Sequence, residues 1–322
     1  MKATARLQVR VQRKSDEAID ICSLELVSAD GGNLPAFSAG SHIDVELPGN
    51  ITRQYSLCNE SDDLHRYVIG VLKDQNSRGG SRAIHEKVSE GDILTISPPK
   101  NHFALAPAAD HSILFAGGIG ITPILCMAER LAAIGESFEL HYCTRSRDRT
   151  AFLKRIDGSG FAKKVVFHFD EGPDQQKLKL ESTLASPTAG VQLYVCGPQG
   201  FMNAVLSRAR EYAWPEDQLH CEFFGAESVK SESDGSFEVQ LASSGRIVLV
   251  SKEQTVAHAL EEAGISVLMS CEQGVCGTCL TRVLEGEPDH RDMFLTEEEH
   301  AKNDQFLPCC SRSKSPRLVL DL

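Results

Sequence analysis

The sequence lacks three features: a long apolar run, an excess of positive charge and an export signal. Among its 322 residues, 33 Lys and Arg stand against 45 Asp and Glu, and the net charge of −12 argues against a nucleic-acid binder. No apolar stretch approaches the roughly 20 residues that span a bilayer, so we expect no contact with a membrane. The basic amino-terminal segment has no apolar core, so we expect no cleaved signal peptide.

Cysteine, by contrast, is present in an unusual number and arrangement. The chain has 11 cysteines, and an odd number without an export signal favours a reducing compartment over a disulfide framework. Five of them lie between residues 271 and 322. This concentration predicts a metal or redox centre in the last part of the chain.

The periodicity of apolar residues changes along the chain, which predicts a multidomain protein. Short alternating runs in residues 1–105 predict an antiparallel β-barrel. In residues 106–226, apolar strands alternate with helix-length segments, which predicts an α/β domain with a parallel sheet. A helix is expected over residues 199–214, ending before Pro215.

A polar segment and a third domain complete the predicted organisation. Residues 227–236 are small and polar and resemble a linker. Residues 237–322 begin with a predicted hairpin and continue with a helix from Val256 that Gly264 ends. This domain has 8 basic and 14 acidic side chains, a balance of −6, so it holds half of the net charge of −12.

The most specific motif is a set of cysteines in the third domain. Four residues separate Cys271 from Cys276, two separate Cys276 from Cys279, and Cys309 follows after 29 more. This is the spacing of plant-type [2Fe–2S] clusters, in which three thiolates on one loop and a distant fourth hold two irons. A zinc site is the alternative, but zinc sites usually use two C-x2-C pairs, and only one is present.

Two glycines and a fifth cysteine accompany these candidate ligands. Gly274 and Gly277 allow backbone N–H groups to turn toward the cluster sulfurs. Cys310 directly follows Cys309, so spacing alone leaves the choice between these two thiols open.

A glycine-rich turn follows the apolar strand at residues 113–116. Glycines at such a turn allow the backbone to approach a pyrophosphate, while Thr122 can cap the next helix and Pro123 suits its first turn. The glycines are Gly117, Gly118 and Gly120. The usual G-x-G-x-x-G fingerprint is absent because Pro123 replaces its third glycine, so an ordinary strand–helix turn is the alternative.

A second turn follows the strand at residues 192–196, where Cys196, Gly197 and Pro198 open the next helix. Ligands of doubly wound sheets bind at the carboxyl ends of the strands. A buried thiol that only packs is the alternative interpretation of Cys196.

The barrel contains two polar segments that suit a phosphorylated ring cofactor. Tyr55 can pack against a ring, Ser56 can donate a hydrogen bond to it, and Arg53 suits a phosphate. Gln54 lies between them, and a second segment carries Gly79, Gly80 and Ser81. Ordinary polar turns are an equally good interpretation. The 11 histidines are scattered, so we expect neither a catalytic triad nor a histidine-based metal site.

Together these segments resemble the phthalate dioxygenase reductase group of the ferredoxin–NADP reductase superfamily, which includes vanillate demethylase reductases. The resemblance spans nearly the whole chain and keeps the order of flavin barrel, nicotinamide domain and β-grasp ferredoxin domain. It rests on RQYSLCN (53–59), RGGS (78–81), AGGIGITP (116–123), TRS (144–146), CGPQGFM (196–202), EFFGA (222–226), CEQGVCGTC (271–279), DHRDMFL (289–295) and PCCSR (308–312).

The resemblance implies a role for each motif. Ser56, Thr122, Cys196 and Phe224 would surround the flavin and nicotinamide rings. FMN would contact Arg53, Gln54, Tyr55, Ser56, Gly70, Val71, Leu72, Gly79, Gly80 and Ser81. The dinucleotide would contact Gly117, Gly118, Gly120, Thr122, Pro123, Thr144, Arg145, Ser146, Cys196, Gly197 and Pro198. Cys309, followed by a small residue as in plant-type ferredoxins, would be the fourth cluster ligand.

The resemblance also implies an activity. A hydride would pass from NADH to FMN, and single electrons would then reach the [2Fe–2S] cluster and a separate Rieske-type oxygenase acting on an aromatic compound. The alternatives are an FAD-type reductase of a small acceptor and a zinc-binding protein without enzymatic activity. We expect a monomer in the bacterial cytoplasm. The acidic excess of the third domain suggests a face on which the oxygenase would dock, made of Glu261, Glu262, Glu285, Glu287, Asp289, Glu297, Glu298 and Glu299. An ordinary solvated surface is an equally good interpretation of these residues.

Overall fold

A computed structural model describes residues 6–48, 51–75, 79–107, 109–224, 234–252, 254–269, 274 and 277–322. The chain forms two compact units, Met1–Glu222 and Phe223–Leu322. Among the described residues, no helix is long and apolar enough to cross a membrane.

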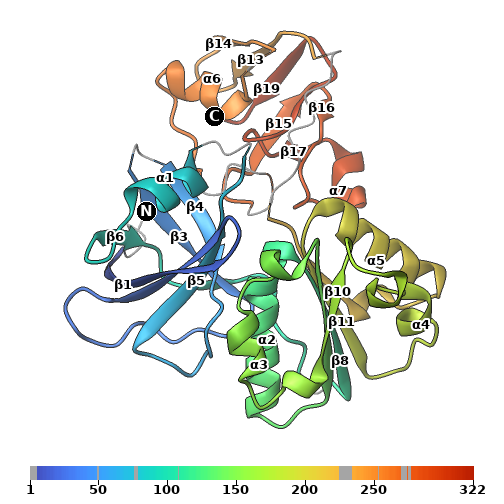
Figure 1. Cartoon of the computed structure of the whole chain (residues 1–322). Helices are drawn as coiled ribbons and strands as arrows, with labels where there is room; N and C mark the ends of the chain where they lie inside the picture. Colours follow the sequence, from blue (N-terminus) through green and yellow to red (C-terminus); the bar gives the residue numbers. More distant parts are fainter. Residues whose placement is uncertain are drawn as a thin grey trace. The chain divides into compact units, whose positions relative to one another are not determined.

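The first unit begins with an antiparallel barrel, drawn in blue in Figure 1. Its strands follow the order β4-β3-β6-β1-β2-β5, and β7 pairs with β3. An isolated antiparallel bridge between Leu57 and Ile69 brings the two ends of this sheet together, as closure of a barrel requires. The elements are β1 Leu7–Ala18, β2 Ile21–Ser28, β3 Ser41–Leu47, β4 Ile51–Ser56, β5 Arg66–Leu72, α1 Gly80–Lys87, β6 Ile93–Ile96 and β7 Lys100–Asn101.

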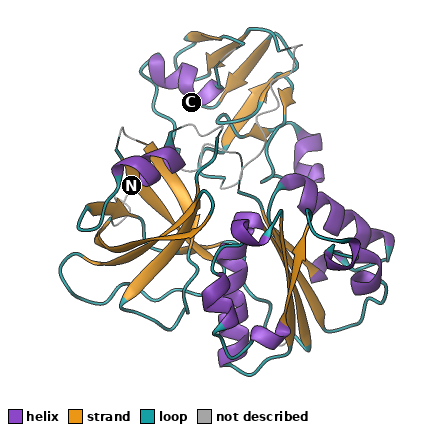
Figure 2. Cartoon of the chain, in the orientation of Figure 1, coloured by secondary structure: helices purple, strands orange, loops and turns teal. Residues whose placement is uncertain are grey.

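A five-stranded parallel sheet completes the first unit. Its order is β10-β9-β8-β11-β12, so the chain reverses direction across the sheet between β8 and β11. Figure 2 shows helices on both faces of this sheet. The elements are β8 His111–Gly117, α2 Ile121–Ala133, β9 Phe138–Thr144, α3 Leu153–Asp157, β10 Val165–Phe169, α4 Leu180–Leu184, β11 Val191–Cys196, α5 Gln199–Glu211 and β12 Leu219–Glu222. This doubly wound topology places ligands at the carboxyl ends of β8 and β11.

The barrel and the parallel sheet share one hydrophobic core. Val68 and Phe103 of the barrel region belong to the same buried cluster as Leu125 of α2 and Tyr142 of β9. This shared core explains why the two domains form one compact unit.

Two local predictions about helix boundaries need correction. Helix α5 ends at Glu211, three residues before the predicted end, because Ala213 has a positive φ of 60°. Thr122 does not cap α2: a 3-10 turn over Gly118–Gly120 precedes the helix, and the N-cap residue is Gly120.

The second unit is a mixed sheet covered by helix α6, with strand order β14-β13-β19-β15-β17 and a separate β16–β18 pair. Strands β13 and β19 are parallel, and the neighbouring pairs are antiparallel, as in a β-grasp fold. The elements are β13 Phe237–Leu241, β14 Ile247–Val250, α6 Val256–Glu262, β15 Thr281–Glu285, β16 Pro288–Asp289, α7 Glu297–Lys302, β17 Gln305–Phe306, β18 Arg312–Ser313 and β19 Arg317–Leu320. The predicted hairpin, helix α6 and its stop at Gly264, with φ of 77°, are confirmed.

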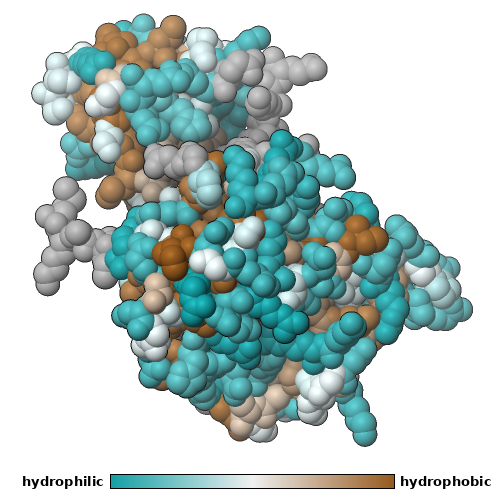
Figure 3. All heavy atoms as spheres, turned by 60° about the vertical axis from the view of Figure 1, so that its left-hand side comes forward, coloured by the Kyte–Doolittle hydropathy of each residue, from teal (hydrophilic) through white to brown (hydrophobic). Residues whose placement is uncertain are grey.

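The edge strand β14 illustrates how alternation positions this sheet. Val248 and Val250 are buried, whereas Ile247 and Leu249 are exposed by 46% and 65%. Figure 3 shows apolar residues gathering on this second unit, over a surface that is otherwise largely hydrophilic.

Candidate active site and cluster-binding loop

A buried polar contact joins the barrel to the parallel sheet. Ser56, at the end of β4, donates a hydrogen bond of 3.3 Å from its Oγ to Oε2 of Glu222, the last residue of β12. His42 of β3 lies on the other side of this carboxyl group, with 3.8 Å between Nδ1 and Oε1. Cys196 is paired with Glu222 in neighbouring parallel strands and is fully buried. Two of the predicted catalytic residues, Ser56 and Cys196, therefore border the same carboxyl group.

Glu222 is a site residue that the sequence analysis missed. Burial raises the pKa of its carboxyl group from 4.5 to about 8, and the hydrogen bond from Ser56 opposes this rise. Glu222 is therefore largely neutral at pH 7. Burial, together with Glu222 and Cys221, also raises the pKa of the Cys196 thiol well above its usual range, so this thiol stays protonated. Glu222 opens the EFFGA segment (222–226), so its place in that motif was the available signal, although the resemblance assigned a role only to Phe224.

Gly70 allows the barrel to approach helix α2 closely. A Cβ at Gly70 would lie 2.8 Å from Cγ2 of Thr122 and 3.0 Å from the ring of Phe152. Thr122 is buried, and its hydroxyl donates a hydrogen bond to the carbonyl of Ile119. The predicted flavin strand and the predicted nicotinamide turn thus meet at Gly70.

The four predicted residues of β4 fall on two faces of the strand, as alternation requires. Gln54 and Ser56 share one face, where Gln54 donates a hydrogen bond to Asp44 and lies 3.3 Å from Nε2 of His42. Arg53 and Tyr55 occupy the other face, where Tyr55 packs against the barrel core. Gln54 is therefore held by neighbouring barrel side chains.

The start of α1 forms a candidate phosphate site. Gly79, the N-cap residue, has a φ of 95° and no side chain of its own to cap the helix. A Cβ at Gly80 would lie 2.6 Å from Cγ of Arg53, so only glycine allows this guanidinium side chain to lie against the helix start. Ser81 Oγ accepts a hydrogen bond from the backbone of Asp74 and keeps its own hydrogen to donate. A helix N-terminus beside an arginine suits a phosphate monoester such as that of FMN.

Glycines of the middle domain let the ends of β8 and β11 pack closely against each other. A Cβ at Gly120 would lie 2.2 Å from the carbonyl oxygen of Cys196, and one at Gly197 would lie 2.9 Å from Cα of Gly117. The ends of β8 and β11 therefore require these glycines for their own packing. Gly118 differs, because it has a φ of 53° and open space where a Cβ would be. Pro123 lies in the first turn of α2, and Pro198 precedes α5 as its N-cap.

The turn after β9 is organised by buried hydroxyl groups. Thr144 and Thr150 share a hydrogen bond of 2.8 Å between their Oγ1 atoms, and Thr144 also donates to the carbonyl of Ser146. The Thr144 hydroxyl is thus used inside the protein. Arg145 is exposed, and Ser146 donates to Asp148, so these two side chains remain at the surface.

Three further predicted contacts lie at strand ends. Val71 is buried in the barrel core and Leu72 is 37% exposed. Phe224 is 36% exposed and belongs to the second unit, so its place opposite the flavin stays a prediction.

Two of the four predicted cluster ligands lie in one apolar pocket of the second unit. Cys279 and Cys309 are 3% and 4% exposed and share a cluster with Leu295 and Leu307. Cys310 is only partly buried, and its Sγ lies 3.7 Å from the carbonyl oxygen of Leu307. Cys271 and Cys276 lie outside the described residues. The burial of two thiols in one pocket fits a cluster that is shielded from water.

The two glycines of this loop have a demonstrable backbone role. Gly274 and Gly277 have φ angles of 71° and 69°. A Cβ at Gly277 would lie 2.3 Å from the ring of Phe294, and one at Gly274 would lie 2.5 Å from Sγ of Cys310. Both positions therefore require glycine, because of conformation and of space.

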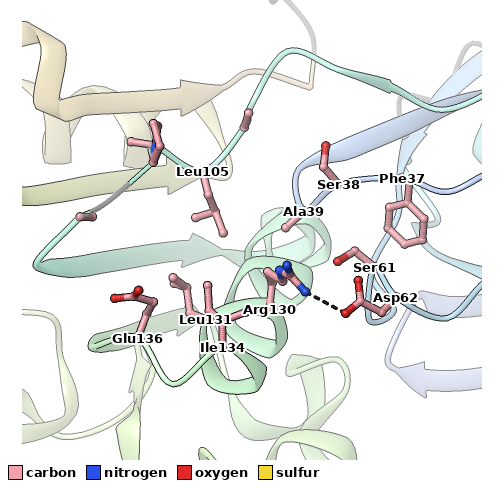
Figure 4. A pocket seen from close by; sticks show the side chains of 14 residues that line it. Phe37, Ser38, Ala39, Ser61, Asp62, Leu105, Arg130, Leu131, Ile134 and Glu136 are labelled. Carbon is pink, nitrogen blue, oxygen red and sulfur yellow. Dashed lines mark hydrogen bonds and ion pairs between the residues drawn. The ribbon is translucent and has the colours of Figure 1, made fainter.

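A separate cavity of about 330 Å³ lies away from these residues. Figure 4 shows it between Phe37, Leu105 and the end of α2, where Arg130 is paired with Asp62 at 2.8 Å. None of the predicted site residues lines it. Leu131, which lines the cavity, lies nine positions after Thr122 on α2, roughly 14 Å along the helix.

Comparison with known proteins agrees with this architecture. Residues 239–314 match the 2Fe-2S iron-sulfur cluster binding domain, and residues 94–219 match the N-terminal domain of dimethylamine monooxygenase subunit DmmA-like proteins. The chain is 58% identical over 313 residues to a vanillate O-demethylase oxidoreductase of Pseudomonas putida, covering 97% of this chain and 98% of the relative. It is 46% identical to a tetrachlorobenzoquinone reductase of Sphingobium chlorophenolicum over 308 residues, 95% of this chain and 94% of the relative.

A solved structure matches along its whole length. It is that of a phthalate dioxygenase reductase, described as a modular structure for electron transfer from pyridine nucleotides to [2Fe-2S]. The TM-score is 0.83 at 39% sequence identity, over 99% of this chain and 98% of that chain.

The fold and the sites define a multidomain flavin iron–sulfur reductase. The chain belongs to the phthalate dioxygenase reductase family, whose members are NADH-dependent reductases with FMN and a [2Fe–2S] cluster. The predicted family, fold class, enzymatic class and cofactors are confirmed, and the interpretation as a zinc-binding protein without activity is excluded.

Proposed function

We propose that this protein is the reductase of a Rieske-type oxygenase that demethylates a methoxybenzoate such as vanillate. The observation that carries the proposal is the 58% identity, over 97% of this chain, to a vanillate O-demethylase oxidoreductase. The buried Ser56–Glu222 contact supports a shared flavin and nicotinamide site, because it joins the barrel to the carboxyl end of β12. When bound, FMN accepts a hydride from NADH and releases single electrons to the cluster, a conversion that the nicotinamide itself cannot perform.

The residues of this chain bind and orient the cofactors in this proposal. Arg53 and the start of α1 hold the FMN phosphate. Ser56 donates its hydrogen to Glu222 and keeps the lone pairs of its hydroxyl oxygen for the ring edge. Thr122 and Cys196 close the site on the side of the nicotinamide. Because Cys196 and Glu222 are both neutral at pH 7, they exclude water and shape the site without acting as a base.

We assign Cys271, Cys276, Cys279 and Cys309 as the cluster ligands. The burial of Cys279 and Cys309 in one apolar pocket, beside a partly buried Cys310, supports this choice. The domains that follow from it are a flavin barrel over residues 1–105, a nicotinamide domain over 106–226 and a ferredoxin domain over 237–322. Residues 227–236 are assigned as the linker; Asp234 within it already pairs with Arg291 of the ferredoxin domain at 2.5 Å.

Reconstitution with a purified oxygenase tests the function. With a Rieske-type vanillate demethylase oxygenase, the reductase should support NADH-dependent release of formaldehyde from vanillate. A phthalate oxygenase serves as the matched control and should be supported less well. Rapid NADH oxidation with ferricyanide but no turnover by the demethylase would overturn the proposal.

The docking site for the oxygenase is proposed at the start of α7. Glu297 and Glu298 are exposed there, directly after Leu295, which packs against Cys279 and Cys309. Other predicted members of the acidic face are neutralised within the protein, since Glu287 pairs with Lys314 and Asp289 with Arg291. Glu261 and Glu262 lie on α6, which Figure 1 shows well apart from α7 in the same unit.

Charge reversal separates these two acidic groups. The double variant Glu297→Lys/Glu298→Lys should lower kcat/KM for the oxygenase at least about tenfold at low salt, and less at high salt. The control variant Glu261→Lys/Glu262→Lys should have less than half that effect. Equal losses in the two variants would place docking elsewhere.

A small-acceptor reductase is the second candidate, because one relative is named a tetrachlorobenzoquinone reductase. The two functions differ in what the cluster domain must contact. A halogenated quinone reduced at a kcat/KM above that measured with any Rieske-type oxygenase would favour this second function.

A further inference from the structure

The second unit gathers three side chains that suit a metal ion distinct from the iron–sulfur cluster. His290 follows β16, Asp292 lies two residues later, and His300 is on α7. One potential ligand atom of each lies within 4.8 Å of the others. Nine residues separate the two histidines, so sequence spacing did not reveal this group, and the scattered histidines predicted no such site.

The imidazole of His290 presents an unused lone pair to this site. The side chain is 8% exposed, and its Nδ1 has no hydrogen-bond partner among the described residues. On the other side of the ring, Nε2 lies 3.2 Å from Oδ1 of Asn303, an acceptor, so the ring hydrogen belongs on Nε2. The bare Nδ1 then faces Oδ1 of Asp292 at 3.7 Å, and two lone pairs repel unless a cation lies between them.

A proton is a poor occupant of this position. The two imidazole rings are stacked, with centroids 4.3 Å apart, so two imidazolium charges would repel strongly.

The distances suit a tetrahedral metal ion instead. Zinc bonds of about 2.0–2.2 Å place neighbouring ligand atoms roughly 3.3–3.6 Å apart. Nε2 of His300 and Nδ1 of His290 lie 3.3 Å and 3.7 Å from the same oxygen, Oδ1 of Asp292. Two imidazoles and one carboxylate are a donor set of zinc sites that keep a fourth position for water. His300 is 27% exposed, so water and ions can reach the site.

The surrounding hydrogen bonds are those expected around metal ligands. A ligating histidine usually donates its second ring N–H to an oxygen, as His290 does to Asn303. The carboxylate of Asp292 is held in place by the backbone N–H of Leu295 at 2.9 Å and by the hydroxyl of Ser311 at 3.3 Å.

We propose that His290, Asp292 and His300 form a second metal site that binds Zn²⁺ or a similar divalent ion. Such an ion ties the loop after β16 to α7. The same loop contacts the cluster-binding loop, because the N–H of Met293 donates to the carbonyl of Gly274 at 2.9 Å.

Zinc binding to the holoprotein tests this site. Protein with a full complement of iron and flavin is freed of adventitious zinc by a chelator that leaves the iron content unchanged. It is then equilibrated with about 1–100 µM ZnCl2, a range that covers a Kd for zinc of about micromolar. Zinc and iron per chain are measured by mass spectrometry. One zinc should bind per chain without loss of iron, and it should raise the unfolding temperature.

Two variants and a control make the test specific. His300→Gln changes a partly exposed side chain and should weaken zinc binding at least tenfold, and His290→Gln should do the same. His258→Gln, exposed on α6, should bind zinc like the unchanged protein. The proposal fails if the His300 and His290 variants keep the affinity, if zinc enters only as iron leaves, or if no zinc binds by 100 µM.

Discussion

Ser56 and Glu222 meet at 3.3 Å across the boundary between the barrel and the parallel sheet. The two residues are far apart in the sequence and lie in two separate motifs, RQYSLCN (53–59) and EFFGA (222–226). Their contact defines the place where the flavin and nicotinamide portions of the site converge. Its protonation state follows from burial rather than from any neighbouring base.

The first prediction concerns the protonation of Glu222. Its pKa is about 8 in the folded protein and 4.5 as the unfolded reference, so between these pH values the folded state holds the extra proton. The stability that this group contributes is complete below about pH 4.5 and is lost as the pH rises through about 8. Glu222→Gln removes this dependence, so the unfolding temperature of the variant relative to the unchanged protein should rise by several degrees between pH 5 and 9.

Thermal unfolding of both proteins across this pH range provides the measurement. The comparison cancels all other titrating groups. A difference in unfolding temperature that stays constant from pH 5 to 9 would contradict the raised pKa.

The second prediction separates the two redox centres. Cys279→Ser should abolish electron delivery to cytochrome c or to the oxygenase, because a cluster ligand is lost, and leave the reduction of the flavin by NADH intact. Cys310→Ser is the matched control and should keep the iron, because its thiol lies toward the carbonyl of Leu307. Stopped-flow bleaching of the flavin and iron analysis measure the two effects. Equal loss of both reactions in Cys279→Ser would count against electron transfer in series.

The third prediction concerns the close approach at Gly70. Gly70→Val adds atoms where a Cβ alone would lie 2.8 Å from Thr122, so the barrel and α2 must move apart. The rate of flavin reduction by NADH should fall at least about tenfold, with the iron content unchanged. Gly160→Ala, at a position with open space, should leave the rate as it is. An unchanged rate in Gly70→Val would show that this contact does not position the rings.

The fourth prediction tests the nucleotide preference. Arg147 is 66% exposed and only 3.9 Å from Asp157, a weak surface pair. If NADH is the substrate, which has no 2′-phosphate to bind, Arg147→Ala should change the KM for NADH less than about twofold. Any residual activity with NADPH should decline. Steady-state kinetics with both nucleotides would expose a role in NADH binding as a large rise in KM.

The sequence by itself determined the domain order, the strand periodicities and the cluster motif. These features are local. Alternation specifies a strand, and cysteines separated by four and by two other residues on one loop can reach the same irons. Tight turns also leave a local signal, and Gly274 and Gly277 were identified correctly from it. The cap assigned to Thr122 was wrong because a 3-10 turn moved the helix start by a few residues, a shift that residue preferences do not reveal.

Tertiary structure decided which distant side chains share an environment. Glu222 becomes a neutral group only because folding buries it beside Ser56, and nothing in its neighbours along the chain predicts that burial. Gly120 and Gly197 serve the packing of β8 against β11. From the sequence, the turn of Gly120 suggested a pyrophosphate and the turn of Gly197 a ligand at a strand end. His290 and His300 stack although nine residues separate them. In each case a distant part of the chain contacts the group and shields it from water. No local sequence pattern encodes such a contact.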